Sequence, residues 1–155
     1  MRRAFARLFF SCWFAALAIQ VSAATGEVIK VLPHFIDLKG RHTVSPSLYE
    51  RDAYQDLLRQ HPEKRSGIRF DVQWKSKGPV SGKLSLIVEA RGITQTNVPV
   101  RMVMEEPVKP PGSFSQWDSV TLAGENYRKF GELTAWRVTL WENETMIGEM
   151  KSFLW

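Results

Sequence analysis

The sequence predicts a mainly β protein, a two-sheet antiparallel sandwich of about seven strands with one inserted α-helix. Short segments of alternating apolar and polar residues recur at regular spacing over residues 25–155, and turn residues separate them. Only Ser45 to His61 carries apolar residues at helical spacing. The chain of 155 residues has a single cysteine, so we expect a hydrophobic core rather than disulfides to hold the fold together.

The N-terminus has the three parts of a secretory signal peptide. Met1 to Arg7 is basic, Leu8 to Val21 is apolar, and Ser22 to Ala24 offers small residues for cleavage. The apolar run is shorter than the roughly 20 residues that span a bilayer, and a buried N-terminal helix is the alternative interpretation. We therefore predict a signal peptide at 1–24, a single domain at 25–155, export to the periplasm or the exterior, and no stable transmembrane segment in the mature chain.

Removal of the signal peptide changes the charge balance. The whole chain has 21 basic and 16 acidic residues, and the loss of Arg2, Arg3 and Arg7 leaves 18 basic residues against 16 acidic ones. Nucleic-acid binding needs a clustered basic face, and the sequence shows none, so we expect no nucleic-acid partner. Cys12 lies in the apolar run, so the mature chain has no thiolate ligand for a metal.

The first part of the mature chain predicts an edge strand and then the helix. Glu27 to Leu38 holds two extended runs with Pro33 between them, which favours an edge strand that is kinked or changes sheets. Ser47, with Glu50 three residues later, matches a capping box for a helix at about 47–61, and Ser45 is the alternative cap. Proline after His61 ends the helix. Its expected apolar stripe consists of Tyr49, Ala53, Tyr54, Leu57 and Leu58.

The central strand is the clearest one. From Ile68 to Trp74 every second residue is apolar, and the residues between them are polar or charged, as in a half-buried strand. Lys83 to Arg91 has the same alternation and is expected to form a hairpin with it. Pro99 gives the strand from Asn97 to Met104 an edge position.

The remaining segments complete the expected sandwich. Residues 105–112 are proline-rich and predict a loop, and Phe114 to Leu122 predicts a strand. Residues 123–132 predict a corner or short helical turn, with Tyr127 and Phe130 filling the core.

The last two strands carry a register prediction. Leu133 to Trp141 and Thr145 to Trp155 both place even-numbered residues on one face. Their apolar faces lie on the same side of the sheet only if even residues pair with even ones, because a slip by one residue turns the apolar side chains of a strand to the opposite face. We therefore predict a three-residue loop at 143–145, with Asn143 or Glu144 near the left-handed region.

About seven strands at this spacing favour an antiparallel sandwich of the immunoglobulin or fibronectin type III kind. The cysteine pair of immunoglobulin domains is missing, as in fibronectin type III domains. We expect Trp74 and Trp136 to occupy the place of that bridge in the core.

No motif in the sequence supports catalysis. His34, His42 and His61 lack the spacing of a metal site, and we expect no cofactor and no bound metal. His42 with Asp37 would form a dyad, but a surface histidine is the favoured interpretation. Glu105 and Glu106 with Asp118 would form a glycosidase pair, but adjacent glutamates beside prolines are typical of a solvated turn. We therefore expect no enzyme activity.

Aromatic residues provide the candidate binding site. Trp141, Phe153 and Trp155 fall on the charged faces of the last two strands, beside Arg137 and Lys151. If they are exposed together, they form an apolar patch of the kind that binds a protein partner or stacks on a sugar. The alternative is that the helix packs over these residues and buries them.

Two blocks of the sequence carry a resemblance. One runs from Lys39–His42 through Ser45–Tyr54 to Phe70–Lys75, and the other joins Ala135–Trp141 to Lys151–Trp155. They resemble small secreted bacterial proteins of uncharacterised function with an immunoglobulin- or fibronectin type III-like sandwich. The resemblance implies export and fold, and it brings no activity, ligand or site residue.

The functional expectation is an exported, non-enzymatic interaction module of the bacterial cell envelope, whose partner is an envelope protein or glycan. A carbohydrate-binding module that uses exposed tryptophans is the first alternative. A small secreted hydrolase without a recognisable motif is the second.

Overall fold

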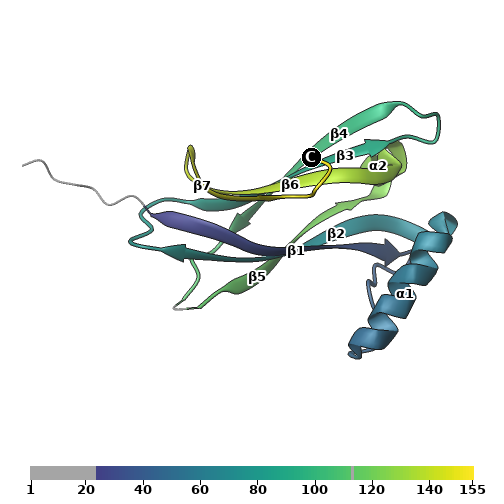
Figure 1. The fold of residues 1–155 in the computed structure, drawn as a ribbon, viewed down its shortest axis with the longest axis horizontal. Coiled ribbons are helices and arrows are strands. Elements are labelled where there is room, and N and C mark those ends of the chain that lie inside the picture. The colour runs from purple at the N-terminus through teal and green to yellow at the C-terminus, as the bar shows by residue number, and fades with distance from the viewer. Residues whose placement is uncertain (1–23, 113) are drawn as a thin grey trace, which may run out of the picture.

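The computed structural model describes residues 24–112 and 114–155, so the predicted signal peptide, apart from Ala24, lies outside the described residues. Within them the chain is mainly β with seven strands, as predicted, but it has two α-helices where one was expected (Figure 1). The elements are β1 (Thr25–Asp37), α1 (Leu48–Gln60), a short 3-10 helix (Pro62–Lys64), β2 (Arg65–Lys77), β3 (Leu84–Ile93), β4 (Pro99–Val108), β5 (Gln116–Ala123), α2 (Gly124–Phe130), β6 (Glu132–Glu142) and β7 (Thr145–Lys151).

The strands form two antiparallel sheets, with orders β1-β2-β5 and β4-β3-β6-β7. The two sheets lie one above the other in Figure 1, and the core fills the space between them. Apolar side chains from both sheets are fully excluded from solvent, because alternate residues of each strand point inward. They include Phe70, Val72, Trp74, Leu86, Val88, Val138 and Leu140.

β2 lies at the centre of its sheet, paired with β1 on one side and β5 on the other. Its predicted dry face is confirmed, since Ile68 and Trp74 are at most 1 % exposed and the apolar residues between them are fully buried. The predicted hairpin between β2 and β3 is wrong, because these strands belong to different sheets. Turn residues at 78–82 signal a change of direction, and a crossing between sheets uses the same residues as a hairpin.

β1 is an edge strand, as predicted, but Pro33 does not interrupt it. Pro33 pairs with Phe70 in a continuous ladder, because an edge strand has N–H positions that no neighbour needs. One irregularity falls at Ile29, an extra residue between the pairs that Val28 and Lys30 make with β2, and a second falls between Ile36 and Asp37.

The β6–β7 hairpin corrects one prediction and confirms another. The loop has two residues rather than three, and Asn143 adopts φ +51°, a conformation that asparagine tolerates. Trp141 therefore pairs with Met146, and the even-to-even pairing of Leu140 with Gly148 is restored only because Ile147 is bulged out. The expected common dry face is present, but a bulge produces it instead of an odd-length loop.

Helix α1 begins at the predicted residue. Ser47 is the N-cap, and its Oγ accepts a hydrogen bond from the Glu50 N–H at 3.5 Å. Ser45 also takes part, because its Oγ accepts from the Ser47 N–H at 3.2 Å. The helix ends at Gln60, before the His61–Pro62 step, as predicted.

The buried face of α1 differs from the predicted stripe. Tyr49 is 84 % exposed, whereas Leu58 and the polar Gln55 are buried. Gln55 fixes the helix to β1 through both ends of its amide: Oε1 accepts from the Phe35 N–H at 2.8 Å, and Nε2 donates to the Phe35 carbonyl at 2.9 Å. A buried amide with both of its groups paired can replace an apolar contact.

The ends of the sandwich are closed in two ways. Tyr127 and Phe130 of α2 are buried in the core, which confirms the predicted corner and its two aromatic side chains. At another edge β1 approaches β7 so closely that a Cβ on Gly148 would lie 2.9 Å from the Gly26 carbonyl oxygen. We call this contact the glycine seam.

The other tertiary predictions concern β4 and the tryptophans. β4 is an edge strand, as predicted, but it continues to Val108, into the first part of the loop expected at 105–112. Trp74 is completely buried, while Trp136 is partly buried and packs against the core. In the described part of the chain, no helix has the length and hydropathy needed to cross a membrane.

Candidate binding sites

The predicted aromatic site is divided in the structure. Trp155 lies against two arginines, with the Arg91 guanidinium carbon 3.8 Å and the Arg137 guanidinium carbon 5.3 Å from its ring centre. Ser152 directs the chain end there, because its Oγ accepts from the Trp136 N–H at 3.0 Å and its N–H donates to the Trp136 carbonyl at 2.9 Å. The C-terminal end therefore curls back toward the outer face of the four-stranded sheet.

Basic residues gather around the buried carboxylate of Glu89 on this face. Glu89 is 7 % exposed, accepts from Arg137 Nη2 at 2.5 Å, and forms a second ion pair with Arg101. Burial raises the pKa of Glu89, but the hydrogen bonds from Arg137 and Arg101 lower it by more than burial raises it. The pKa of Glu89 therefore lies below its usual value. Lys151 extends the group, because it is the register partner of Arg137. We call Arg91, Arg101, Arg137, Lys151 and Trp155 the basic face.

Phe153 and Trp141 lie outside this arrangement. The Phe153 side chain is fully exposed. Trp141 lies four residues along β6 from Arg137, about 13 Å at the usual rise of a strand, and its indole N–H donates to Thr139 Oγ1 at 2.8 Å. Helix α1 does not cover these residues, because it packs against β1 of the other sheet (Figure 1).

A second site, which the sequence did not reveal, lies on the outer face of the three-stranded sheet. It is an open cavity of about 310 Å³. Three strands, the loop after β1 and helix α1 contribute to it. Its lining residues are Leu32, His34, His42, Arg51, Arg69, Asp71, Trp117 and Ser119. We call it the Asp71 pocket.

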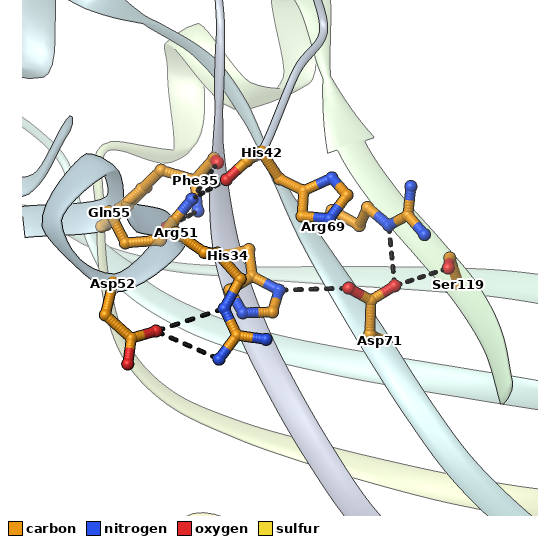
Figure 2. Close-up of polar contacts among 9 residues, drawn as sticks. All are labelled: His34, Phe35, His42, Arg51, Asp52, Gln55, Arg69, Asp71 and Ser119. Carbon is orange, nitrogen blue, oxygen red and sulfur yellow. Dashed lines mark hydrogen bonds and ion pairs between the residues drawn. The ribbon is translucent and has the colours of Figure 1, made fainter. Parts of the chain in front are cut away.

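Strand alternation and register assemble this pocket. The inward residues of β2 fill the core, so Arg69 and Asp71 must point outward. Arg69 pairs with His34 of β1, and Asp71 pairs with Ser119 of β5, so polar side chains of all three strands meet on one surface. Figure 2 shows Asp71 between His34 on one side and Arg69 and Ser119 on the other.

Asp71 is held by three donors. His34 Nδ1 lies 3.1 Å from Oδ2, while Oδ1 accepts from Arg69 Nε at 2.7 Å and from Ser119 Oγ at 2.6 Å. Burial raises the pKa of Asp71, but the hydrogen bonds from His34, Ser119 and Arg69 hold it well below its usual range. The carboxylate is therefore ionised at neutral pH, and its position is fixed.

A second histidine lies over the first one. The ring centres of His34 and His42 are 5.5 Å apart, and the rings are stacked. Gln55 Nε2 donates to the His42 carbonyl at 2.7 Å, so the buried amide of α1 also positions this loop. Burial and the nearby Arg69 lower the pKa of His42 below its usual 6.5, so its ring is uncharged at pH 7.

The order of the polar groups differs from that of a nucleophilic triad. In a nucleophilic triad the histidine stands between the serine and the aspartate and moves the proton. Here Asp71 stands between Ser119 and His34, so the serine hydrogen is directed to a carboxylate that holds no proton at neutral pH. The pocket therefore offers fixed polar contacts and an aromatic side chain, Trp117.

The other sequence candidates have local partners. Asp37 accepts from Tyr54 at 2.6 Å and pairs with Arg41 at 2.8 Å, and these contacts hold the loop after β1. Asp118 accepts from the buried Trp74 indole at 2.7 Å. His61 pairs with Glu63 at 2.9 Å. Among the described residues, no group of three or more His, Cys, Asp or Glu side chains is arranged to hold a metal ion.

One signal of the Asp71 pocket was present in the sequence. The alternation of β2 places Arg69 and Asp71 on its outer face, but it does not identify the neighbouring strands. His34 and Ser119 meet Asp71 only because β1 and β5 flank β2. Comparison with known proteins adds no information on function, because no family model, no curated protein and no solved structure matches the chain.

Proposed function

We propose that this chain is an exported, non-enzymatic interaction module of the bacterial cell envelope, which binds an acidic protein or glycan through the basic face. The N-terminal pattern of residues 1–24 supports export. The order of polar groups around Asp71 supports a binding role over acyl transfer.

We also propose that the sandwich is of the immunoglobulin or fibronectin type III kind. In variable-type immunoglobulin domains an additional strand joins the sheet of the third, sixth and seventh core strands. Here β4 lies beside β3 in the sheet that also contains β6 and β7. This strand order supports the finer assignment.

One observation carries the functional proposal: the guanidinium groups of Arg91 and Arg137 lie against the Trp155 ring on the outer face of a sheet. Arginine and tryptophan are the residues that most often dominate binding energy at interfaces. Arg91, Arg101, Arg137 and Lys151 outnumber the three carboxylates of this face, which belong to Glu89, Glu105 and Glu149, so the face keeps excess positive charge. The strands hold these groups in place before a partner arrives, which lowers the entropy cost of binding.

Affinity capture from native envelope extract tests the proposal. The full chain, recovered after export, serves as bait beside a Trp155→Ala/Lys151→Gln variant that leaves the Glu89 ion pairs intact. Trp141→Ala, at the other end of β6, is the matched tryptophan control. We expect wild type and Trp141→Ala to retain one defined acidic species, and the double variant to lose it while keeping the wild-type melting temperature.

Salt dependence provides a second measurement. Because the proposed attraction is between charges at a solvent-exposed surface, retention should weaken as the salt concentration rises. Equal capture by all three proteins, or retention that salt leaves unchanged, would contradict the basic face as the binding surface.

A further inference from the structure

The Asp71 pocket presents hydrogen-bond donors that no protein group uses. Arg69 donates to Asp71 through Nε, and in the described part of the chain its two terminal amino groups form no hydrogen bond. Arg51 donates to Asp52 through Nε and Nη2 and leaves Nη1 without a protein acceptor there. Figure 2 shows the two guanidinium groups at the two ends of the His34–Asp71 pair, with Arg51 beside His34 and Arg69 near Ser119.

The carboxylate oxygens of Asp71, in contrast, are engaged. Both oxygens of Asp71 already accept hydrogen bonds, and one of them accepts two. Asp52, the partner of Arg51, is largely exposed, so water screens its charge. A ligand that satisfies the free arginine donors must therefore bring acceptors of its own, and a planar carboxylate matches the fork of a guanidinium group.

An exposed aromatic side chain in the pocket favours a ligand that contains a ring. Trp117 lines the same cavity, and its side chain is 49 % exposed. It lies on β5 two residues before Ser119, so it points to the same face of the sheet as the Asp71 contacts. An indole face next to fixed polar groups suits a ring with an apolar face and a polar edge. A cavity of about 310 Å³ is at the small end of ligand sites, which favours one ring unit.

We propose that the Asp71 pocket binds a saccharide ring that carries a carboxylate. Trp117 packs against the apolar face of the sugar, and the free amino groups of Arg69 and Arg51 bind the carboxylate. This site lies on the sheet opposite the basic face, so it does not depend on the partner proposed for that surface.

Calorimetric titration of the full chain with two matched probes tests the inference. The first is a trimer of galacturonic acid, and the second is the same trimer with every carboxylate methyl-esterified, which removes the charge and keeps the rings. We expect the acid form to bind at least about tenfold more tightly, since charge-assisted hydrogen bonds exceed neutral ones by that order. Equal affinities, or no binding of either trimer, would overturn the proposal.

Variants locate the site. Trp117→Ala should weaken binding of the acid trimer about tenfold or more, through loss of the ring contact. Arg69→Gln should remove most of the preference for the acid over the ester. Arg51→Gln, on the surface of α1, provides the same test without altering Asp71. Arg128→Gln, an exposed arginine on α2, is the matched control and should bind like wild type.

The design separates this site from the basic face. Trp155→Ala should leave titration of the acid trimer unchanged. If Trp155→Ala abolishes the binding and Trp117→Ala does not, the sugar lies on the other sheet and the pocket assignment is wrong.

Discussion

The indole N–H of Trp74 donates a 2.7 Å hydrogen bond to the carboxylate of Asp118 on the neighbouring strand. Trp74 is fully buried, so this donor has no access to water. Asp118→Ala would leave the indole N–H unpaired, and we expect a loss of about 1–3 kcal/mol in the free energy of unfolding. Asp118→Asn keeps an acceptor oxygen and should lose less. Urea titration measures both, and equal losses would contradict this role.

The two core tryptophans should differ in their contribution to stability. Trp74→Ala removes a completely buried side chain and should cost about 3–5 kcal/mol. Trp136 is only partly buried, so Trp136→Ala should cost less while still lowering the melting temperature. Chemical denaturation of the two variants provides the comparison. Wild-type melting of Trp136→Ala would show that its ring contributes nothing to the core.

The free energy of unfolding should fall at acid pH, because the carboxylate that holds the loop after β1 becomes protonated there. Burial raises the pKa of Asp37, but hydrogen bonds from Tyr54 and Arg41 hold it well below its usual range. A carboxyl group with a lowered folded pKa adds stability above its unfolded pKa of about 3.9, and that stability is lost as the pH falls toward the folded pKa.

Asp37→Asn should therefore be less stable than wild type at pH 6 and should lose less stability between pH 6 and pH 2. Unfolding free energies measured across this range provide the check. Glu106→Gln, at an exposed position on β4, is the control and should retain the wild-type slope. The same slope in Asp37→Asn and wild type would contradict the assignment.

The glycine seam should tolerate no added methyl group. A Cβ on Gly148 would lie 2.9 Å from the Gly26 carbonyl oxygen and 3.0 Å from its carbonyl carbon, and backbone atoms cannot move aside cheaply. We expect Gly148→Ala to lose about 1–3 kcal/mol of stability. Gly112→Ala, with nothing within 4 Å of the added Cβ, should melt like wild type in the same thermal scan. A stable Gly148→Ala would show that the two edges can separate.

The parts of the fold that depend on local pattern could be predicted from the sequence. Alternation identified the buried face of β2, the Ser47 cap set the start of α1, and Tyr127 with Phe130 marked the corner. Strand pairing was less accessible, because alternation gives the face of a strand and not its neighbour. The same limit explains why β2 and β3 were assigned to one hairpin.

Polar anchoring was a second feature that pattern could not reveal. The apolar spacing of α1 favoured Tyr49 as a contact residue, but the helix is fixed through the amide of Gln55. The predicted even-to-even pairing of the last two strands is present at Leu140 and Gly148, although the bulge at Ile147 and not the loop length produces it. In both cases a local backbone or side-chain contact does what the sequence pattern assigned to another feature: the Gln55 amide in place of Tyr49, and the Ile147 bulge in place of a longer loop.

The candidate sites also differ in how far the sequence could reveal them. Arg137, Lys151 and Trp155 lie together because register brings the first two into a pair, whereas Trp141 is separated along the strand. The Asp71 pocket requires residues from β1, β2, β5, α1 and a loop. No single stretch of sequence contains that set, so only the tertiary arrangement could identify it.

The sheet order has a consequence for how fast the chain folds. Each sheet contains one central pairing between strands that are distant in sequence, because β2 must meet β5, and β3 must meet β6, across roughly 40 to 60 residues. Closing loops of that length costs entropy before any contact compensates, so this topology belongs among the slow, millisecond-to-second folders. A newly made chain would therefore expose its apolar strands on that timescale, before the two sheets form.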